Sequence, residues 1–116
     1  MRQGRALAWL AVAVGMGVAG ALAQAARAQD GSYVLTFKEN KLEPAELEVP
    51  AGQDFTLLVK NADPTPEEFE SDDLALEKII AGGSEAQFAI EALEPGRYYV
   101  FGEFHEDTAA GHIVAK

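Results

Sequence analysis

Two short segments of the chain carry the residues best suited to binding a metal ion. In the first, residues 67–73, five of the seven residues are acidic. Carboxylates crowded in this way repel one another unless a positive charge lies nearby. The stretch between Lys60 and Lys78 contains no Lys or Arg, so a metal ion is a natural counter-charge. A solvated acidic loop is the alternative, and it is the more common meaning of such a charge run.

The spacing within this first segment assigns its side chains to faces. In an extended chain, Glu68 and Glu70 point to the same side and Phe69 points to the other. Phe69 would then anchor the segment in a core. The two carboxylates would present oxygen ligands on the opposite side.

The second segment, residues 98–105, is the strongest strand candidate in the chain. Extended backbone would place Glu103 and His105 on one face, where a carboxylate and an imidazole could reach the same cation. Gly102 between them would allow another backbone to come close. The alternative is a solvated strand end at which Glu103 and His105 hydrogen-bond to each other. The candidate metal ligands are therefore Glu68, Glu70, Glu103 and His105.

Short strands separated by turns are expected to position these residues. Alternating patterns with β-branched and aromatic residues predict strands at 33–37, 46–49, 55–59, 87–90, 98–105 and 111–115. Turn signals recur about every ten residues, which favours a β-sandwich.

Residues 71–80 fit two structures. Ser71 with the two aspartates after it could cap a short helix, with acids at its positive end. Equally, Leu74, Leu76, Lys78 and Ile80 share the parity of a strand. The pattern leaves both open.

The N-terminal part of the chain reads as an export signal. A basic start at residues 1–5 precedes an apolar run at 6–23 and an Ala-x-Ala end, which predicts cleavage after Ala28. The chain would then consist of a leader, 1–28, and one domain, 29–116, without a membrane span after cleavage. The run is rich in Ala and Gly, which makes a permanent anchor the less favoured alternative.

Cleavage would also change the charge. Three of the nine basic residues lie in the leader and all 19 acidic residues follow it, so the net charge would go from −10 to −13. Such a surface repels nucleic acid and anionic lipid, so neither is an expected partner.

Sulfur is absent from the predicted domain. The chain has no cysteine, and both methionines, Met1 and Met16, fall in the leader. This composition excludes disulfides, thiol catalysis, iron–sulfur clusters and thiolate copper sites.

Several ordered motifs together resemble those of the cupredoxins. They are Phe37–Ala45, Leu47–Gly52, Val59–Asn61, Leu93–Phe101 and Gly111–Val114. The resemblance covers essentially all of the predicted domain. It implies an all-β, Greek-key β-sandwich of about seven or eight strands in a periplasmic protein.

The sequence departs from the cupredoxin pattern at its metal ligands. By the resemblance, Glu103 stands at the usual cysteine, and Glu67 or Glu68 stands where the first histidine is expected. Thr108 and Ala109 lie near the usual axial methionine, and His105 alone is retained. Without a thiolate, a blue-copper electron carrier is excluded.

The variant motifs at 68–71 and 102–105 are similar to a subgroup of cupredoxin-like proteins associated with bacterial iron uptake. In that subgroup the domain occurs beside high-affinity iron permeases or in their periplasmic partners. The resemblance implies that Glu68, Glu70, Glu103 and His105 bind an iron or copper ion at one end of the sandwich. Carboxylates in place of sulfur suit iron, or copper in its oxidised form.

The main hypothesis is therefore a periplasmic metal-binding protein that supports ferrous-iron uptake through an inner-membrane permease. A copper-handling protein is one alternative, and a metal-free β-sandwich that serves as an interaction module is another. Oxidation of ferrous iron would need an electron acceptor. The sequence indicates none, so an enzymatic role stays open.

Overall fold

The computed structural model describes residues 31–116, and these fold into β-strands with a short 3-10 turn after β8 and no α-helix. The elements are β1 (Ser32–Lys38), β2 (Lys41–Glu43), β3 (Glu46–Val49), β4 (Phe55–Asn61), β5 (Glu67–Ser71), β6 (Leu76–Ile80), β7 (Glu85–Ile90), β8 (Gly96–Gly102), η2 (Glu103–His105) and β9 (Ala110–Ala115). The predicted leader and its cleavage site lie outside the described residues. Within residues 31–116, no helix has the length and apolar character needed to cross a membrane.

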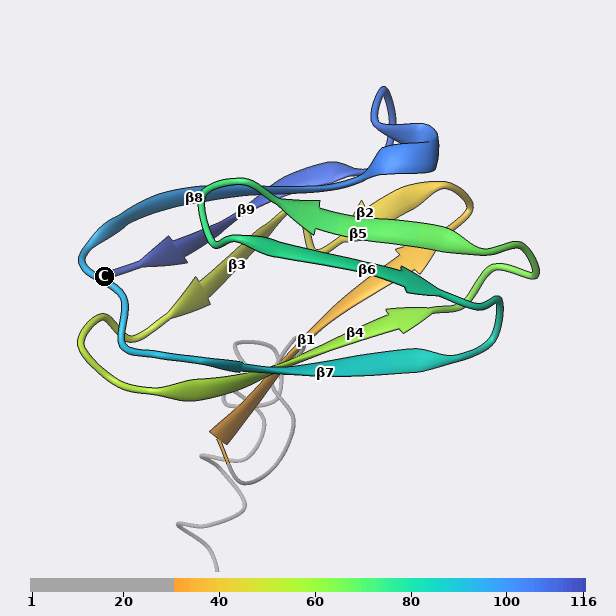
Figure 1. The fold of residues 1–116 in the computed structure, drawn as a ribbon. Helices are drawn as coiled ribbons and strands as arrows, with labels where there is room; N and C mark the ends of the chain where they lie inside the picture. The colour runs from red at the N-terminus through yellow and green to blue at the C-terminus, as the bar shows by residue number, and fades with distance from the viewer. Residues whose placement is uncertain (1–30) are drawn as a thin grey trace, which may run out of the picture.

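The strands form two sheets that face each other as a sandwich (Figure 1). One sheet has the order β2-β1-β4-β7 and the other the order β3-β9-β8-β5-β6. β1 pairs with β4 and β3 with β9 in parallel, whereas the other neighbours are antiparallel. The predicted all-β sandwich is confirmed. The described part of the chain has nine strands rather than seven or eight, partly because three-residue β2 is too short to show an alternating pattern.

The core lies between the two sheets and is built by alternation along the strands. In β1 and β4 every second side chain is buried. Phe37 from one sheet and Phe69 from the other are fully buried and meet edge to face, with ring centroids 6.3 Å apart. Burying a large apolar side chain contributes about 1.5–3 kcal/mol. Phe69 thus anchors β5 to the core.

Residues 71–80 form a turn followed by a strand. The turn occupies residues 72–75, where Ala75 has a φ of 58°, and β6 then pairs antiparallel with β5. The hydroxyl of Ser71 accepts a hydrogen bond from the Leu74 N–H (3.2 Å) and donates one to the Tyr99 carbonyl (2.7 Å). Among the described strands, β6 is the outer edge of its sheet.

Strand β8 ends earlier than the sequence pattern predicts. It stops at Gly102, which packs so closely on Glu67 that a Cβ at that position would lie 2.7 Å from the carboxyl carbon of Glu67. The chain then passes through η2 and a following turn, in which the Ala109 N–H donates a 2.8 Å hydrogen bond to the His105 carbonyl. The prediction that Glu103 and His105 lie on one face of an extended strand is therefore wrong.

Candidate metal centre

Strand β5 directs two carboxylates away from the core. Glu67, Phe69 and Ser71 are buried, whereas Glu68 and Glu70 between them are partly exposed. The predicted alternation of this segment is thus confirmed. Glu68 and Glu70 lie together on the outer face of the five-stranded sheet.

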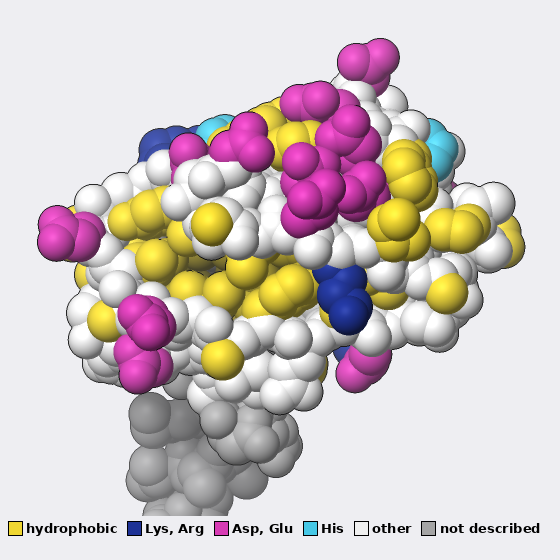
Figure 2. All heavy atoms as spheres, in the orientation of Figure 1, with side chains coloured by type: hydrophobic (Ala, Val, Ile, Leu, Met, Phe, Trp, Pro, Cys, Tyr) yellow, Lys and Arg dark blue, Asp and Glu magenta, His cyan; other side chains and the backbone are white. Residues whose placement is uncertain are grey.

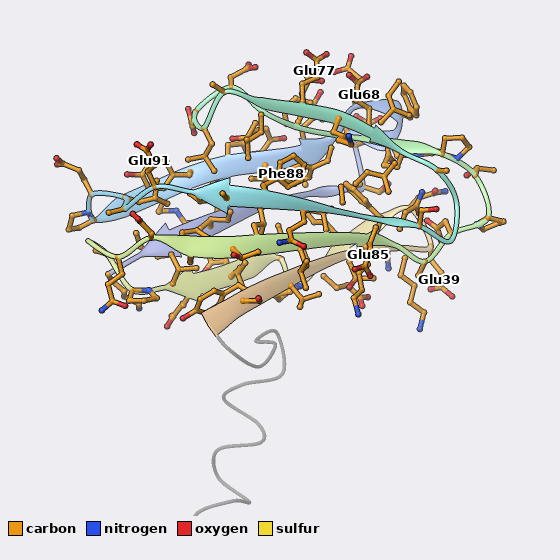
Figure 3. All side chains as sticks on the ribbon, turned by 60° about the horizontal axis from the view of Figure 1, so that its bottom comes forward. Glu39, Glu68, Glu77, Glu85, Phe88 and Glu91 are labelled. Carbon is orange, nitrogen blue, oxygen red and sulfur yellow. The ribbon has the colours of Figure 1, made fainter. Side chains whose placement is uncertain are left out.

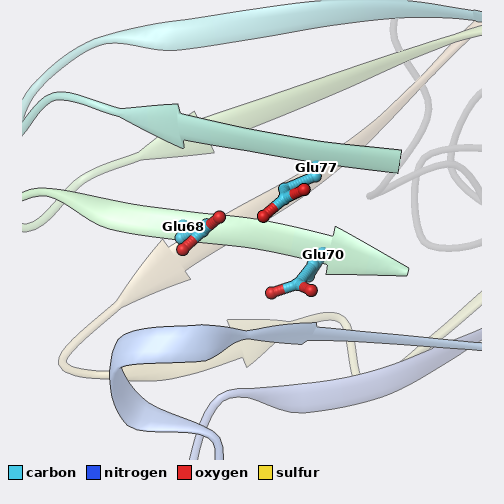
Figure 4. A group of neighbouring side chains, drawn as sticks. All are labelled: Glu68, Glu70 and Glu77. Atoms are coloured by element: carbon cyan, nitrogen blue, oxygen red, sulfur yellow. The ribbon is translucent and has the colours of Figure 1, made fainter. Parts of the chain in front are cut away.

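A third carboxylate reaches the same place from β6. The register of the β5–β6 pair sets Glu70 directly opposite Glu77, with Glu68 opposite Ile79. Carboxylate oxygens of Glu68, Glu70 and Glu77 lie within 4.8 Å of one another (Figure 4). Like charges opposite each other in a sheet are destabilising, so this arrangement favours a bound proton or cation.

The fourth carboxylate comes from η2. Glu103 hydrogen-bonds to Glu70, and this is the main cause that raises the pKa of Glu70 from 4.5 to about 7. Desolvation and the charges of Glu103, Glu77 and Glu68 raise the pKa further. We call Glu68, Glu70, Glu77 and Glu103 the acidic face.

Glu68 and Glu77 form a second carboxyl pair within the acidic face. Their hydrogen bond is the main cause of a raised pKa at Glu68, followed by desolvation and by the charges of Glu77, Glu103 and Glu67. A hydrogen bond between two carboxyl groups requires a proton on one of them. Proton binding at Glu68 is therefore favoured relative to an isolated surface carboxylate.

No basic side chain offsets this charge among the described residues. Acidic side chains gather over β5 and β6 on the surface (Figure 2). The ion pairs of the described residues join Arg97 to Glu46, His105 to Glu67 and Lys116 to Glu48. Lys78 is paired with Phe69 in the sheet, so it lies on the other face of β6 from Glu77. The acidic face is thus open to a cation from solution.

His105 makes a different contact. Its Nδ1 lies 2.7 Å from Oε2 of Glu67, whose side chain is buried. Glu67 and Glu68 are neighbours in β5 and point to opposite faces. The structure therefore brings together three of the four predicted ligands, Glu68, Glu70 and Glu103, whereas Nδ1 of His105 contacts the buried Glu67.

Two residues of this region were not singled out from the sequence. Glu77 looks like half of a surface charge pair with Lys78, and only the β5–β6 register brings it opposite Glu70. By the resemblance, Glu67 is one of two residues at the usual first histidine, but it is not among the candidate ligands predicted from the sequence. Its parity with Phe69 was the available signal, since both side chains point inward.

Two further acidic residues, Asp73 and Glu106, bond to Tyr99. Asp73 accepts a hydrogen bond from the Tyr99 N–H at 2.8 Å, and Glu106 accepts one from the Tyr99 hydroxyl at 3.2 Å. Burial is the main cause of the raised pKa of Tyr99, and the Glu106 hydrogen bond adds to it. These two carboxylates are thus engaged in hydrogen bonds within the protein.

The donor set fits some metal ions and not others. Carboxylate oxygens suit hard or borderline cations such as iron or Cu(II), whereas a blue-copper site needs a cysteine thiolate. The chain has no cysteine. The acidic face can therefore offer oxygen ligands to iron or oxidised copper, and a thiolate copper centre does not fit.

Comparison with known sequences gives a family and one relative. A sequence profile described as "Cupredoxin-like domain" matches residues 7–115 of the chain. The uncharacterized protein RP394 of Rickettsia prowazekii (strain Madrid E) is 44% identical over 80 residues, which cover 69% of this chain. The matched part spans 64% of that relative's length.

Comparison with solved structures gives the same fold. A mutant of amicyanin in its Cu(I) form is 23% identical, with a TM-score of 0.62, over 79% of this chain and 89% of the other. A novel purple cupredoxin from Nitrosopumilus maritimus is 19% identical, with a TM-score of 0.56, over 72% of this chain and 98% of the other. At these identities the likeness concerns the fold.

Proposed function

This chain belongs to the family of cupredoxin-like domains, and from that premise we propose that it carries a metal cation on its acidic face. The cargo is iron or oxidised copper. The role is to support ferrous-iron uptake in the periplasm by supplying an inner-membrane permease.

One observation carries the proposal. Carboxylate oxygens of Glu68, Glu70 and Glu77 lie within 4.8 Å of one another, and hydrogen bonding of Glu70 with Glu103 and of Glu68 with Glu77 raises the pKa of Glu70 and of Glu68. None of them takes part in an ion pair among residues 31–116. A cation can replace the shared protons and remove the repulsion between the charged groups, so the arrangement favours cation binding.

The exposure of the acidic face favours a carrier over a closed store. Glu68 and Glu70 are partly exposed and Glu77 is exposed, so a bound cation remains within reach of a receiving protein. A cation bound at an open carboxylate site can also exchange with solution, which is compatible with its transfer to another protein. The predicted export signal and the excess of acidic residues support a periplasmic location and attraction of cations.

Calorimetry of the purified protein tests the binding step. Titration with Fe(II) under anaerobic conditions, and separately with Cu(II), should show one cation per chain at pH 7. The variant Glu68→Gln/Glu70→Gln/Glu77→Gln should abolish this binding because it removes three of the converging ligands. The variant Glu39→Gln/Glu85→Gln/Glu91→Gln is the matched control.

The control removes the same charge from positions away from the acidic face (Figure 3). It should leave the affinity near that of the unmodified protein. Equal loss in both variants would show diffuse attraction instead of a site. Binding of Cu(II) without Fe(II) would favour the copper-handling alternative, and binding of neither ion would reject the proposal.

The uptake role needs a second experiment in cells. Deleting the gene should lower iron uptake under iron limitation, and the unmodified chain should restore it. The variant of the acidic face should fail to restore uptake although the matched control succeeds. Normal iron uptake in the deletion strain would remove the link to a permease.

A further inference from the structure

Glu67 is a buried carboxylate with a full set of partners. Its relative exposure is 3%, and Oε2 lies 2.7 Å from Nδ1 of His105. Oε1 accepts hydrogen bonds from the backbone N–H groups of Glu68 and Phe104, each at 2.9 Å. A carboxylate oxygen accepts, so Nδ1 of His105 is the donor in this pair. Hydrogen bonds to a charged acceptor are stronger than neutral ones.

These contacts connect β5 to the turn η2. Phe104 and His105 are the two residues that follow Glu103, and both bond to the same buried side chain. Gly102, the residue before Glu103, packs so closely on Glu67 that a Cβ would lie 2.7 Å from the Glu67 carboxyl carbon. The backbone on both sides of Glu103 is therefore held by Glu67.

Side chains on the two faces of β5 have different roles. Glu67 points inward and holds the turn, whereas Glu70 points outward and hydrogen-bonds to Glu103. Glu103 thus reaches the acidic face from a turn that is held on the opposite side of the strand. His105 bonds to Glu67, the side chain that holds the turn.

We propose that His105 is a positioning residue, which bonds to Glu67 so that Glu103 stays against Glu70, and that it does not bind the cation. This inference rests on the proposed function, because it assigns the ring a part in building that site. The carboxylate that accepts from Nδ1 of His105 points to the inner side of β5, whereas Glu68 and Glu70 point to the outer face. A different side chain with an N–H at the position of Nδ1 would donate the same hydrogen bond to Glu67 and could therefore replace His105.

Two substitutions separate positioning from ligation. His105→Ala removes the donor to Glu67 and should weaken cation binding about tenfold or more, as loss of a supporting hydrogen bond does in metal sites. His105→Asn keeps an N–H at the position of Nδ1 and should recover most of this affinity. An Asn variant that binds as weakly as the Ala variant would overturn the proposal, since it would show that the imidazole itself is needed.

A double-substitution cycle gives an independent readout. If His105 acts through Glu103, then His105→Ala should cause no further loss of affinity in a Glu103→Gln background. A ligand would behave differently, because its removal would weaken binding again in that background. Additional loss of about tenfold would therefore overturn the proposal.

A measurement without metal separates this inference from the proposed function. Hydrogen exchange of the Phe104 amide reports its bond to Glu67, so protection should fall in His105→Ala and persist in His105→Asn. Equal protection in the two variants would overturn the positioning role even if cations bind. If the unmodified protein binds no cation, the proposed function fails and amide exchange alone decides whether His105 holds the turn.

Discussion

Glu70 and Glu77 face each other directly across the antiparallel strands β5 and β6. Both side chains lie on the outer face of the sheet, where Glu68 and Glu103 add two more carboxyl groups. In a sheet, opposite-charge pairs at such positions stabilise and like-charge pairs destabilise. The pair is thus unfavourable for folding unless a proton or a cation lies between the two groups.

Reversing one charge of this pair should raise stability and remove binding. In metal-free protein at pH 8, we expect Glu77→Lys to raise the melting temperature by a few degrees, because it replaces repulsion with attraction. The same variant should bind neither Fe(II) nor Cu(II). Glu91→Lys is the control for net charge and should change neither property; an equal rise in melting temperature there would point to overall charge as the cause.

Cation affinity should depend on pH through Glu70. Its pKa is raised to about 7 by the Glu103 hydrogen bond, so a proton competes with the cation below that pH. We expect binding at pH 6 to be about tenfold weaker than at pH 8, following the protonated fraction of one group. Calorimetry in two buffers of different ionisation enthalpy should detect proton release at pH 7. Affinity that does not vary between pH 6 and pH 8 would contradict this expectation.

Cation affinity should rise with pH, whereas the stability of the metal-free protein should fall as pH rises. Glu70 keeps its proton to about pH 7 when folded, whereas the ordinary value is 4.5. Between these values the folded state binds more protons than the unfolded state, so stability falls as pH rises. The contribution of this group is complete below pH 4.5 and lost as pH passes about 7. Urea unfolding from pH 5 to pH 8 should show a smaller fall in Glu70→Gln than in Glu39→Gln.

Gly102 should be intolerant of any side chain. In Gly102→Ala the new Cβ would meet the Glu67 carboxyl carbon at 2.7 Å and the Phe37 ring at 2.9 Å. Overpacking of a buried position costs about 1–3 kcal/mol, which urea unfolding can measure. Gly96→Ala is the matched control, since nothing lies closer than 3.9 Å to its Cβ. Equal unfolding midpoints for the two variants would show that the packing around Glu67 is loose.

The sequence predicts the parts of the structure that local patterning controls. Phe69 between Glu68 and Glu70 is enough to assign these residues to opposite faces, because strand side chains alternate. The same alternation predicts the inward residues of β1 and β4. It does not decide between a strand and a helix for residues 71–80, because packing against β5 selects the strand there.

The arrangement of the acidic face depends on contacts between distant segments. The Glu70–Glu77 pair exists because the turn at 72–75 sets the register of β6, and local patterning does not determine this register. His105 was expected to point the same way as Glu103 in an extended strand. The backbone leaves the strand after Gly102, and the close packing of Gly102 on Glu67, 35 positions earlier in the sequence, cannot be seen in local patterning.

The position of β6 at the edge of the five-stranded sheet has a consequence for the behaviour of the protein in solution. An edge strand offers unpaired backbone groups to other molecules, and charged side chains are a common protection against such aggregation. On β6 this protection comes from Glu77 and Lys78, next to Ile79, whose exposure is 60%. A cation that neutralises Glu77 would weaken this protection against aggregation. Under the proposed function, loading with a cation would therefore make this edge of the sheet more prone to self-association.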